Sequence, residues 1–243
     1  MQTLKALLVS WGGWPCGVMV LAQWEAAYLT GVTLSFQATA LTIAGTLAMY
    51  AADRGLERRL VVSQGDRHRH HPRLDKIMIF LVLGFLVLGL SSWQPRVFLW
   101  AGILAILGAL YLAITVNVIQ PPALVKEGVG SLCFTYLVWG LVAGKTVWVV
   151  AFFLMGLANF IWSGIQDRER DSINKIPSLA HSSPRLAVVA ARTLAVGSGL
   201  LFLVLLDRPS WFATVALLHG FWPPRWPVDW AFLPLGMVLF RFI

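Results

Sequence analysis

Charged residues are scarce in this sequence. Asp, Glu, Lys and Arg make up 12% of the 243 residues, whereas soluble domains usually carry about 25%. So few charges exclude an ordinary soluble domain, because they leave too little polar surface to face water. Two long stretches, Ile77 to Leu90 and Val97 to Pro122, hold no charge at all. Since ~20 apolar residues cross a hydrocarbon core of ~30 Å, the composition predicts a polytopic integral membrane protein.

Cysteine is scarce as well. Cys16 and Cys133 both fall within apolar stretches, and the sequence contains no CxxC pair. A disulfide-stapled fold and a cysteine-ligated zinc site therefore have no support. A cleavable signal peptide is not indicated either, because no small-x-small site follows the first apolar stretch. We interpret that stretch as the first membrane span.

What the sequence does contain is a series of apolar segments. We expect an all-α bundle of about eight or nine transmembrane helices, forming a single integral membrane domain over residues 1–243. The predicted spans are 6–22, 33–52, 77–94, 97–118, 129–143, 147–166, 185–206, 209–221 and 229–243. The last two are short and rich in Pro and Trp, so they are the ones expected to be tilted, re-entrant or interfacial.

Basic residues crowd the connections that follow the even-numbered spans, of which the longest are 53–76 and 167–184. Outside the spans, only Arg96, Lys145 and Arg208 fall on the opposite side. The positive-inside rule makes the crowded side cytoplasmic, in an inner, plasma or thylakoid-type membrane. Loop bias and anionic lipid headgroups account for the net charge of +8, so we predict membrane lipids and no nucleic acid as partners.

Two acidic pairs end the second and sixth spans. Asp53 and Glu57 are four residues apart, as are Asp167 and Asp171, and residues at this spacing share one helix face. Either pair alone is typical of a solvated helix end with ion pairs to neighbouring arginines. Repetition favours a shared site, because both pairs begin with Asp-Arg and lie four spans apart, as in two pseudo-repeated four-helix units. Carboxylates from two helices would suit Mg2+, which prefers hard oxygen ligands.

At these segments the sequence resembles a divergent member of the UbiA-type superfamily of intramembrane prenyltransferases. The first family motif is approximately NxxxDxxxD, and its positions are occupied here by Met49, Asp53 and Glu57. The second is approximately DxxxDxxxD, and its positions are occupied by Ser163, Asp167 and Asp171. A further family feature is a Lys followed by an apolar run and Trp-Gly, which matches Lys126, Trp139 and Gly140.

The resemblance implies transfer of an isoprenyl group from an isoprenyl diphosphate to an electron-rich, aromatic acceptor within the membrane, with Mg2+ as cofactor. The implied metal ligands are Asp53, Glu57, Asp167 and Asp171. The implied catalytic residues are Asp53, Asp167 and Lys126, of which Lys126 would donate to the leaving diphosphate. Arg58 and Arg170 are further candidate donors to the substrate.

Other functions stay open. Met49 and Ser163 stand where the family motifs begin with Asn and Asp, which favours a non-catalytic relative that binds an isoprenoid, a pigment or a protein partner. A transporter or unrelated membrane protein is a third possibility, although the spans hold few polar residues near the mid-membrane. Arg192, within the seventh span, is expected to need a partner or to snorkel. We interpret His219 as an interfacial residue.

Overall fold

The structure is a computed structural model, and it describes residues 13–60, 72–91, 94–116, 118–142, 144–205, 210–223, 231–232 and 234–235. Its helices are α2 (Gly13–Thr30), α3 (Phe36–Leu60), α4 (Pro72–Leu90), α5 (Pro95–Thr115), α6 (Val125–Trp139), α7 (Thr146–Gln166), α8 (Arg168–Ile173), α9 (Leu179–Ser182), α10 (Pro184–Leu205) and α11 (Trp211–Phe221). No strand occurs among these residues. The predicted all-α class is therefore confirmed.

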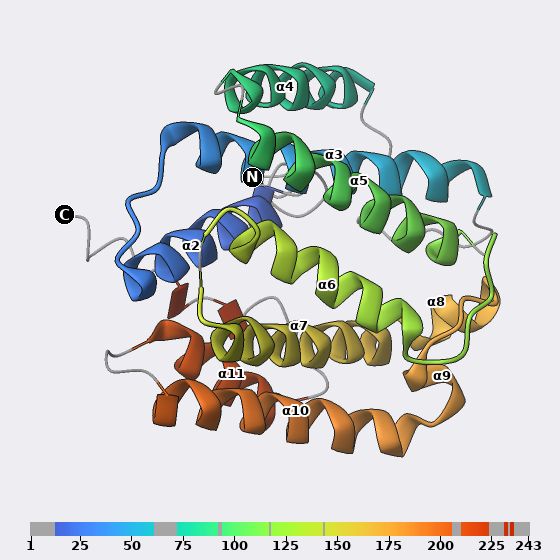
Figure 1. Ribbon diagram of the computed structural model, residues 1–243. Helices are drawn as coiled ribbons and strands as arrows, with labels where there is room; N and C mark the ends of the chain where they lie inside the picture. Colours follow the sequence, from blue (N-terminus) through green and yellow to red (C-terminus); the bar gives the residue numbers. More distant parts are fainter. Residues whose placement is uncertain are drawn as a thin grey trace.

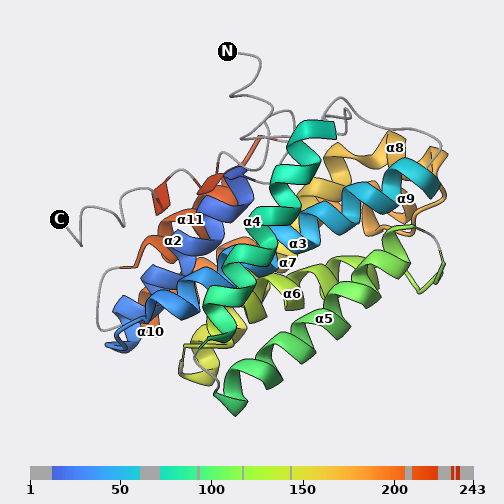
Figure 2. The same ribbon diagram turned by 90° about the horizontal axis from the view of Figure 1, so that it is seen from above.

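The long helices lie side by side in one bundle (Figure 1). α4 packs against α3 at one edge, α6 lies between α5 and α7, and α7 packs against α10 toward the other edge. The C-terminal ends of α3, α5 and α7 lie at one end of the bundle, together with the short helices α8 and α9. Figure 2, seen from above, shows α8 and α9 at this same end, next to the end of α3. We call it the motif end, because both acidic segments meet there.

Proline and serine define several helix starts. Pro72, Pro95 and Pro184 are the first residues of α4, α5 and α10. Proline suits this position because its fixed φ is helical and its missing N–H would have had no intrahelical partner. Ser210 precedes α11, and its hydroxyl accepts a hydrogen bond from the Phe212 N–H at 3.1 Å. This N-cap satisfies one of the free donors at the start of the helix.

The first eight predicted spans each correspond to one long helix, but the first is misplaced. The predicted end at residue 22 is wrong, because α2 continues to Thr30. The extra turns carry Gln23 and Glu25, which are both fully buried inside the bundle. The predicted ninth span, 229–243, lies mostly outside the described residues.

Two further boundaries differ near the motif end. α3 continues to Leu60, so the predicted end of the second span at residue 52 is wrong and the first acidic segment lies within the helix. α6 begins at Val125, so Lys126 lies in the first turn of the helix instead of before it. The second connection, 167–184, contains the two short helices α8 and α9. Both changes give the candidate site residues a regular helical placement.

The outer surface of the bundle is apolar. Pro95–Thr115, Thr146–Gln166 and Pro184–Val204 are each long and apolar enough to cross a membrane. Large side chains face outward from three helices, with Phe80, Ile106 and Val204 being 74%, 70% and 78% exposed. Apolar surface of this extent is typical of proteins that face lipid or a partner instead of water. The helices are thus built as those of an integral membrane protein.

A buried carboxylate joins the first described helix to the last long one. Glu25 on α2 is fully buried, and its Oε1 accepts a hydrogen bond from the backbone N–H of Trp211 at 2.8 Å. Trp211 is the first residue of α11, where unpaired N–H groups and the helix dipole stabilise a negative charge. Glu25 therefore fastens the start of α11 to α2.

Loss of the contact between Glu25 and Trp211 should lower the stability of the protein. We expect Glu25→Ala to lower the free energy of unfolding by about 1–3 kcal/mol, because a buried donor loses its acceptor. Denaturant or thermal unfolding of the purified protein in detergent would measure the change. Glu169→Ala removes an exposed carboxylate from α8 and is the matched control. The same unfolding midpoint for both variants would contradict a stabilising role for Glu25.

Candidate active site

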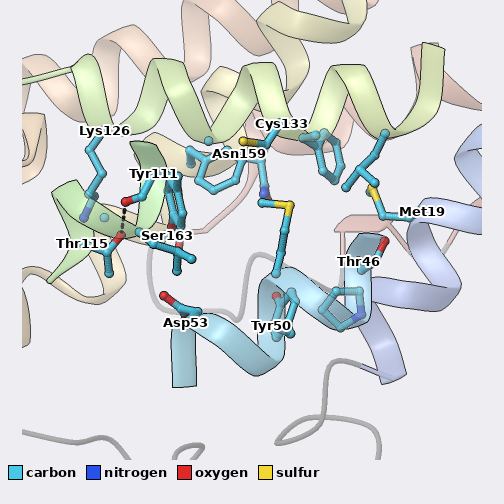
Figure 3. Close-up of a pocket in the computed structure, with 18 of the residues that line it drawn as sticks. Met19, Thr46, Tyr50, Asp53, Tyr111, Thr115, Lys126, Cys133, Asn159 and Ser163 are labelled. Atoms are coloured by element: carbon cyan, nitrogen blue, oxygen red, sulfur yellow. Dashed lines mark hydrogen bonds between the residues drawn. The ribbon is translucent and has the colours of Figure 1, made fainter. Parts of the chain in front are cut away.

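A cavity of about 220 Å³ lies between α2, α3, α5, α6 and α7. Figure 3 shows Lys126 and Thr115 toward one end of this cavity and Met19 and Thr46 toward the other, with Asn159 between them. The first of these ends faces the motif end of the bundle, because α6 begins there. The cavity is therefore elongated, and its two ends differ in chemistry.

Charged side chains gather at the motif end of the cavity. Asp53 reaches it from α3, Lys126 from α6, Asp167 from the end of α7, and Asp171 from α8. Figure 3 shows Asp53 pointing into the cavity from its helix. The structure thus brings residues of both acidic segments and the lysine to one cavity. Carboxylates outnumber the ammonium group among these four, which favours the binding of further cations.

Lys126 and Asp171 form a buried ion pair. The Lys126 Nζ donates to Asp171 Oδ2 at 2.7 Å, and the two side chains are 11% and 0% exposed. Such charge-assisted hydrogen bonds are shorter and stronger than neutral ones. Because both groups are withdrawn from water, the pair holds the lysine in place, and removal of either partner leaves a buried charge.

Backbone hydrogen bonds continue the helical conformation from Ser163 to Asp171, through the second acidic segment. The Asp167 N–H donates to the Ser163 carbonyl oxygen and the Asp171 N–H donates to the Asp167 carbonyl oxygen, both at 2.8 Å. These four-residue contacts keep Asp167 and Asp171 one turn apart on one face, so both reach the cavity. Lys175, with φ of 55°, then turns the chain so that Ile176 also lines the cavity.

Glu127, which sequence analysis did not single out, supports this arrangement. It is fully buried, and its Oε1 accepts a hydrogen bond from the Leu179 N–H at 3.0 Å, where α9 begins. Its other oxygen, Oε2, has no hydrogen-bond partner in the part of the chain that the structure describes. The carboxylate therefore fastens α9 to α6 beside the ion pair. In the sequence, only the position of Glu127 next to Lys126 marks it as a candidate site residue.

Other predicted residues are placed only in part. Three of them have their backbone in α3 or α8 and side chains outside the described part of the chain: Glu57, Arg58 and Arg170. Met49 and Ser163, at the leading positions of the two motifs, both line the cavity. The Ser163 hydroxyl donates to Asp167 Oδ2 at 3.5 Å, so it contacts the carboxylate one turn further along the helix.

An asparagine and a histidine supply polar groups away from the charged end. Asn159 on α7 lines the cavity, and its amide lies 3.2 Å from Nε2 of His219. The imidazole Nδ1 lies 2.8 Å from the Val215 carbonyl oxygen, and the ring packs against Phe232 with centroids 4.9 Å apart. His219 is fully buried, so its interpretation as interfacial is wrong. A single histidine in a short apolar helix does not reveal which face is covered.

The donors at the charged end suit Mg2+. Asp53 and Asp167 offer hard carboxylate oxygens from two helices, and Mg2+ usually takes one or two carboxylates plus water and phosphate oxygens. Among the described side chains, no group of three or more His, Cys, Asp or Glu could hold a metal. Asp53 and Asp167 would therefore supply only part of the coordination shell of such an ion.

Comparison with known proteins supports the fold. No protein family and no curated protein matches the chain by sequence. By structure, the chain is similar to a UbiA homolog from Archaeoglobus fulgidus bound to GPP and Mg2+, with a TM-score of 0.68 and 15% sequence identity. The match covers 98% of this chain and 96% of that one. The chain thus has a UbiA-type fold, as the motif resemblance predicts.

Proposed function

We propose that this chain is a prenyltransferase that moves an isoprenyl group from an isoprenyl diphosphate to an electron-rich acceptor within the membrane. The observation that carries this proposal is the meeting of Asp53, Asp167 and Lys126 on one cavity with an aromatic inner wall. A diphosphate needs metal ligands and a cation, and an isoprenoid needs an apolar chamber. Support also comes from the fold, which this chain shares with a protein solved with GPP and Mg2+.

Lys126 is the donor to the leaving diphosphate. Its ammonium group lines the cavity and is held by Asp171 at 2.7 Å, so its position is set before a substrate arrives. A preorganised cation beside the breaking C–O bond stabilises the negative charge that develops on the leaving group. In this arrangement we assign Asp171 as a positioning residue for Lys126, in place of the Mg2+ ligand that the motif resemblance implies.

Asp53 and Asp167 hold Mg2+ in this proposal. When bound, the ion supplies positive charge that neutralises the diphosphate. Glu57 follows Asp53 by one turn of α3, and we assign it as a further ligand. Arg58 and Arg170, on α3 and α8, are assigned as additional donors to the diphosphate.

The inner wall of the cavity keeps water from the reacting carbon. Phe134, Phe160 and Ile176 line it together with Trp14 and Met19. An allylic cation persists long enough to meet its acceptor only where water is excluded. The same apolar and aromatic side chains would hold the isoprenoid tail.

A non-catalytic role in binding an isoprenoid or a pigment is the second candidate. Met49 and Ser163 favour it, since both line the cavity where the family motifs have Asn and Asp. A thioether and a hydroxyl are weaker ligands for Mg2+ than an amide oxygen and a carboxylate. Such a protein would keep the apolar chamber and bind its ligand without turnover.

Metal removal tests the proposal. Purified protein given Mg2+, a labelled isoprenyl diphosphate and a lipophilic phenol should release diphosphate and form a prenylated product. EDTA should abolish both, and added Mg2+ should restore them, because the carboxylates alone would repel the diphosphate. Tight binding of the diphosphate without release at any Mg2+ concentration would support the second candidate. The absence of both diphosphate binding and diphosphate release would contradict both candidates.

A further inference from the structure

Asn159 places an amide in an otherwise apolar part of the cavity. It precedes Asp167 by eight residues of α7, which is ~12 Å along a helix. Phe134, Phe160 and Phe232 line the same cavity, and Figure 3 shows Asn159 between its two ends. Within the described residues the amide has one hydrogen-bond partner, His219, at 3.2 Å. The other end of the amide is therefore available to a ligand.

His219 determines which end of the amide faces the cavity. Its Nδ1 lies 2.8 Å from the Val215 carbonyl oxygen, which can only accept, so Nδ1 carries a proton. The ring is fully buried beside Phe232, and no described carboxylate contacts it. An unpaired imidazolium would be costly there, so the ring is neutral.

A neutral ring with its proton on Nδ1 has an acceptor at Nε2 and needs a donor there. The two ends of an amide have nearly the same shape, so the hydrogen-bond network assigns them. The structure places the Asn159 carbonyl oxygen, Oδ1, 3.2 Å from Nε2, and in this orientation two acceptors would face each other. With the NH2 group toward Nε2, the contact is a hydrogen bond. The carbonyl oxygen then faces the cavity as an acceptor.

We propose that Asn159, oriented by His219, accepts a hydrogen bond from a hydroxyl group of the acceptor substrate, an inference that rests on the proposed prenyl transfer. An isoprenoid tail offers no donor, and would leave this oxygen unpaired in a dry chamber at a cost in free energy. A hydroxyl-bearing aromatic molecule, such as a lipophilic phenol, satisfies it. The ring is then held between Asn159 and the charged end, with its far edge toward the site where the isoprenyl group is released.

Thr46 provides a matched comparison. It lines the same cavity from α3, but its hydroxyl donates to the Thr42 carbonyl oxygen of its own helix at 2.8 Å. Thr46 lies toward the end of the cavity opposite Lys126, whereas the proposed ring lies between Asn159 and the charged end, so Thr46 is not expected to contact the hydroxyl group of the ligand. Thr46→Val therefore changes a polar lining residue without removing the proposed recognition group.

Binding of two probes tests the proposal without any isoprenyl diphosphate. We expect wild-type protein to bind 4-octylphenol about tenfold more tightly than its methyl ether, as the loss of one buried hydrogen bond predicts. Quenching of tryptophan fluorescence would give both dissociation constants. Asn159→Leu should abolish the preference by weakening binding of the phenol, whereas Thr46→Val should keep it. Equal affinities in the wild type, or a preference that survives Asn159→Leu, would overturn the proposal.

The binding preference is measured independently of catalysis. A protein that releases no diphosphate can therefore still be tested for it. A second measurement keeps the proposal testable if Asn159→Leu does not fold. Nitrogen-15 NMR of histidine-labelled protein should show His219 neutral, with its proton on Nδ1. Its signal is assigned by its absence from His219→Gln. A protonated ring at neutral pH would reverse the amide and overturn the proposal.

Discussion

Asp167→Asn is expected to slow diphosphate release by about a hundredfold or more. Asparagine keeps the size of the side chain but removes the negative charge that holds the metal. Loss of a single electrostatic contact to a developing charge costs about 10²–10³ in rate. Asp53→Asn should act in the same way from α3, because both residues line the cavity and share one proposed ion. Single-turnover assays with saturating Mg2+ would measure the rate constants.

Glu169→Gln is the control for this prediction. Glu169 lies two residues from Asp167 but is exposed on α8 and does not line the cavity. Its replacement removes the same charge from the same segment and should leave the rate unchanged. If Asp167→Asn and Asp53→Asn both kept wild-type turnover, the metal assignment would be wrong.

Lys126→Met is expected to affect both stability and turnover. The methionine leaves the Asp171 carboxylate buried without its cation, and breaking such a pair costs about 3–5 kcal/mol. The leaving diphosphate also loses its donor, so turnover should fall even in the fraction that stays folded. Denaturant unfolding and the diphosphate-release assay would measure the two losses separately.

A double variant separates these two losses. Lys126→Met combined with Asp171→Leu removes both charges, and exchange of a buried pair for apolar side chains is often neutral. Stability should return toward that of the wild type while turnover stays lost. Recovery of turnover in the double variant would show that Lys126 is not a donor to the substrate. A double variant as unstable as Lys126→Met would show that the ion pair is not the source of the loss.

Local patterns were sufficient to predict the helical architecture. Apolar segments and flanking charges identify membrane helices because both signals lie within one helix and its ends. The pairs at Asp53 and Asp167 indicated a common site because each follows an even-numbered span and repeats the other. The ion pair between Lys126 and Asp171 was not predicted, although both had been named, because 45 residues separate them and no local pattern records the contact.

Polar residues within apolar helices were harder to interpret. Glu25 is buried because α11 places the Trp211 N–H against it, a contact that the neighbours of Glu25 in sequence do not reveal. Asn159 and His219 lie 60 residues apart, and each alone is compatible with packing, solvation or ligand binding. Only the fold brings them together at the wall of one cavity.

The contact between Glu25 and Trp211 also sets an order in time. The two residues are 186 apart in the chain, and a ribosome adding roughly 5–20 residues per second needs on the order of 10–40 s to pass from one to the other. Throughout this interval α2 has been made and α11 has not. The contact between α2 and α11 can therefore form only after Trp211 has been made, and nascent chains released before Trp211 would be natural substrates for membrane quality control.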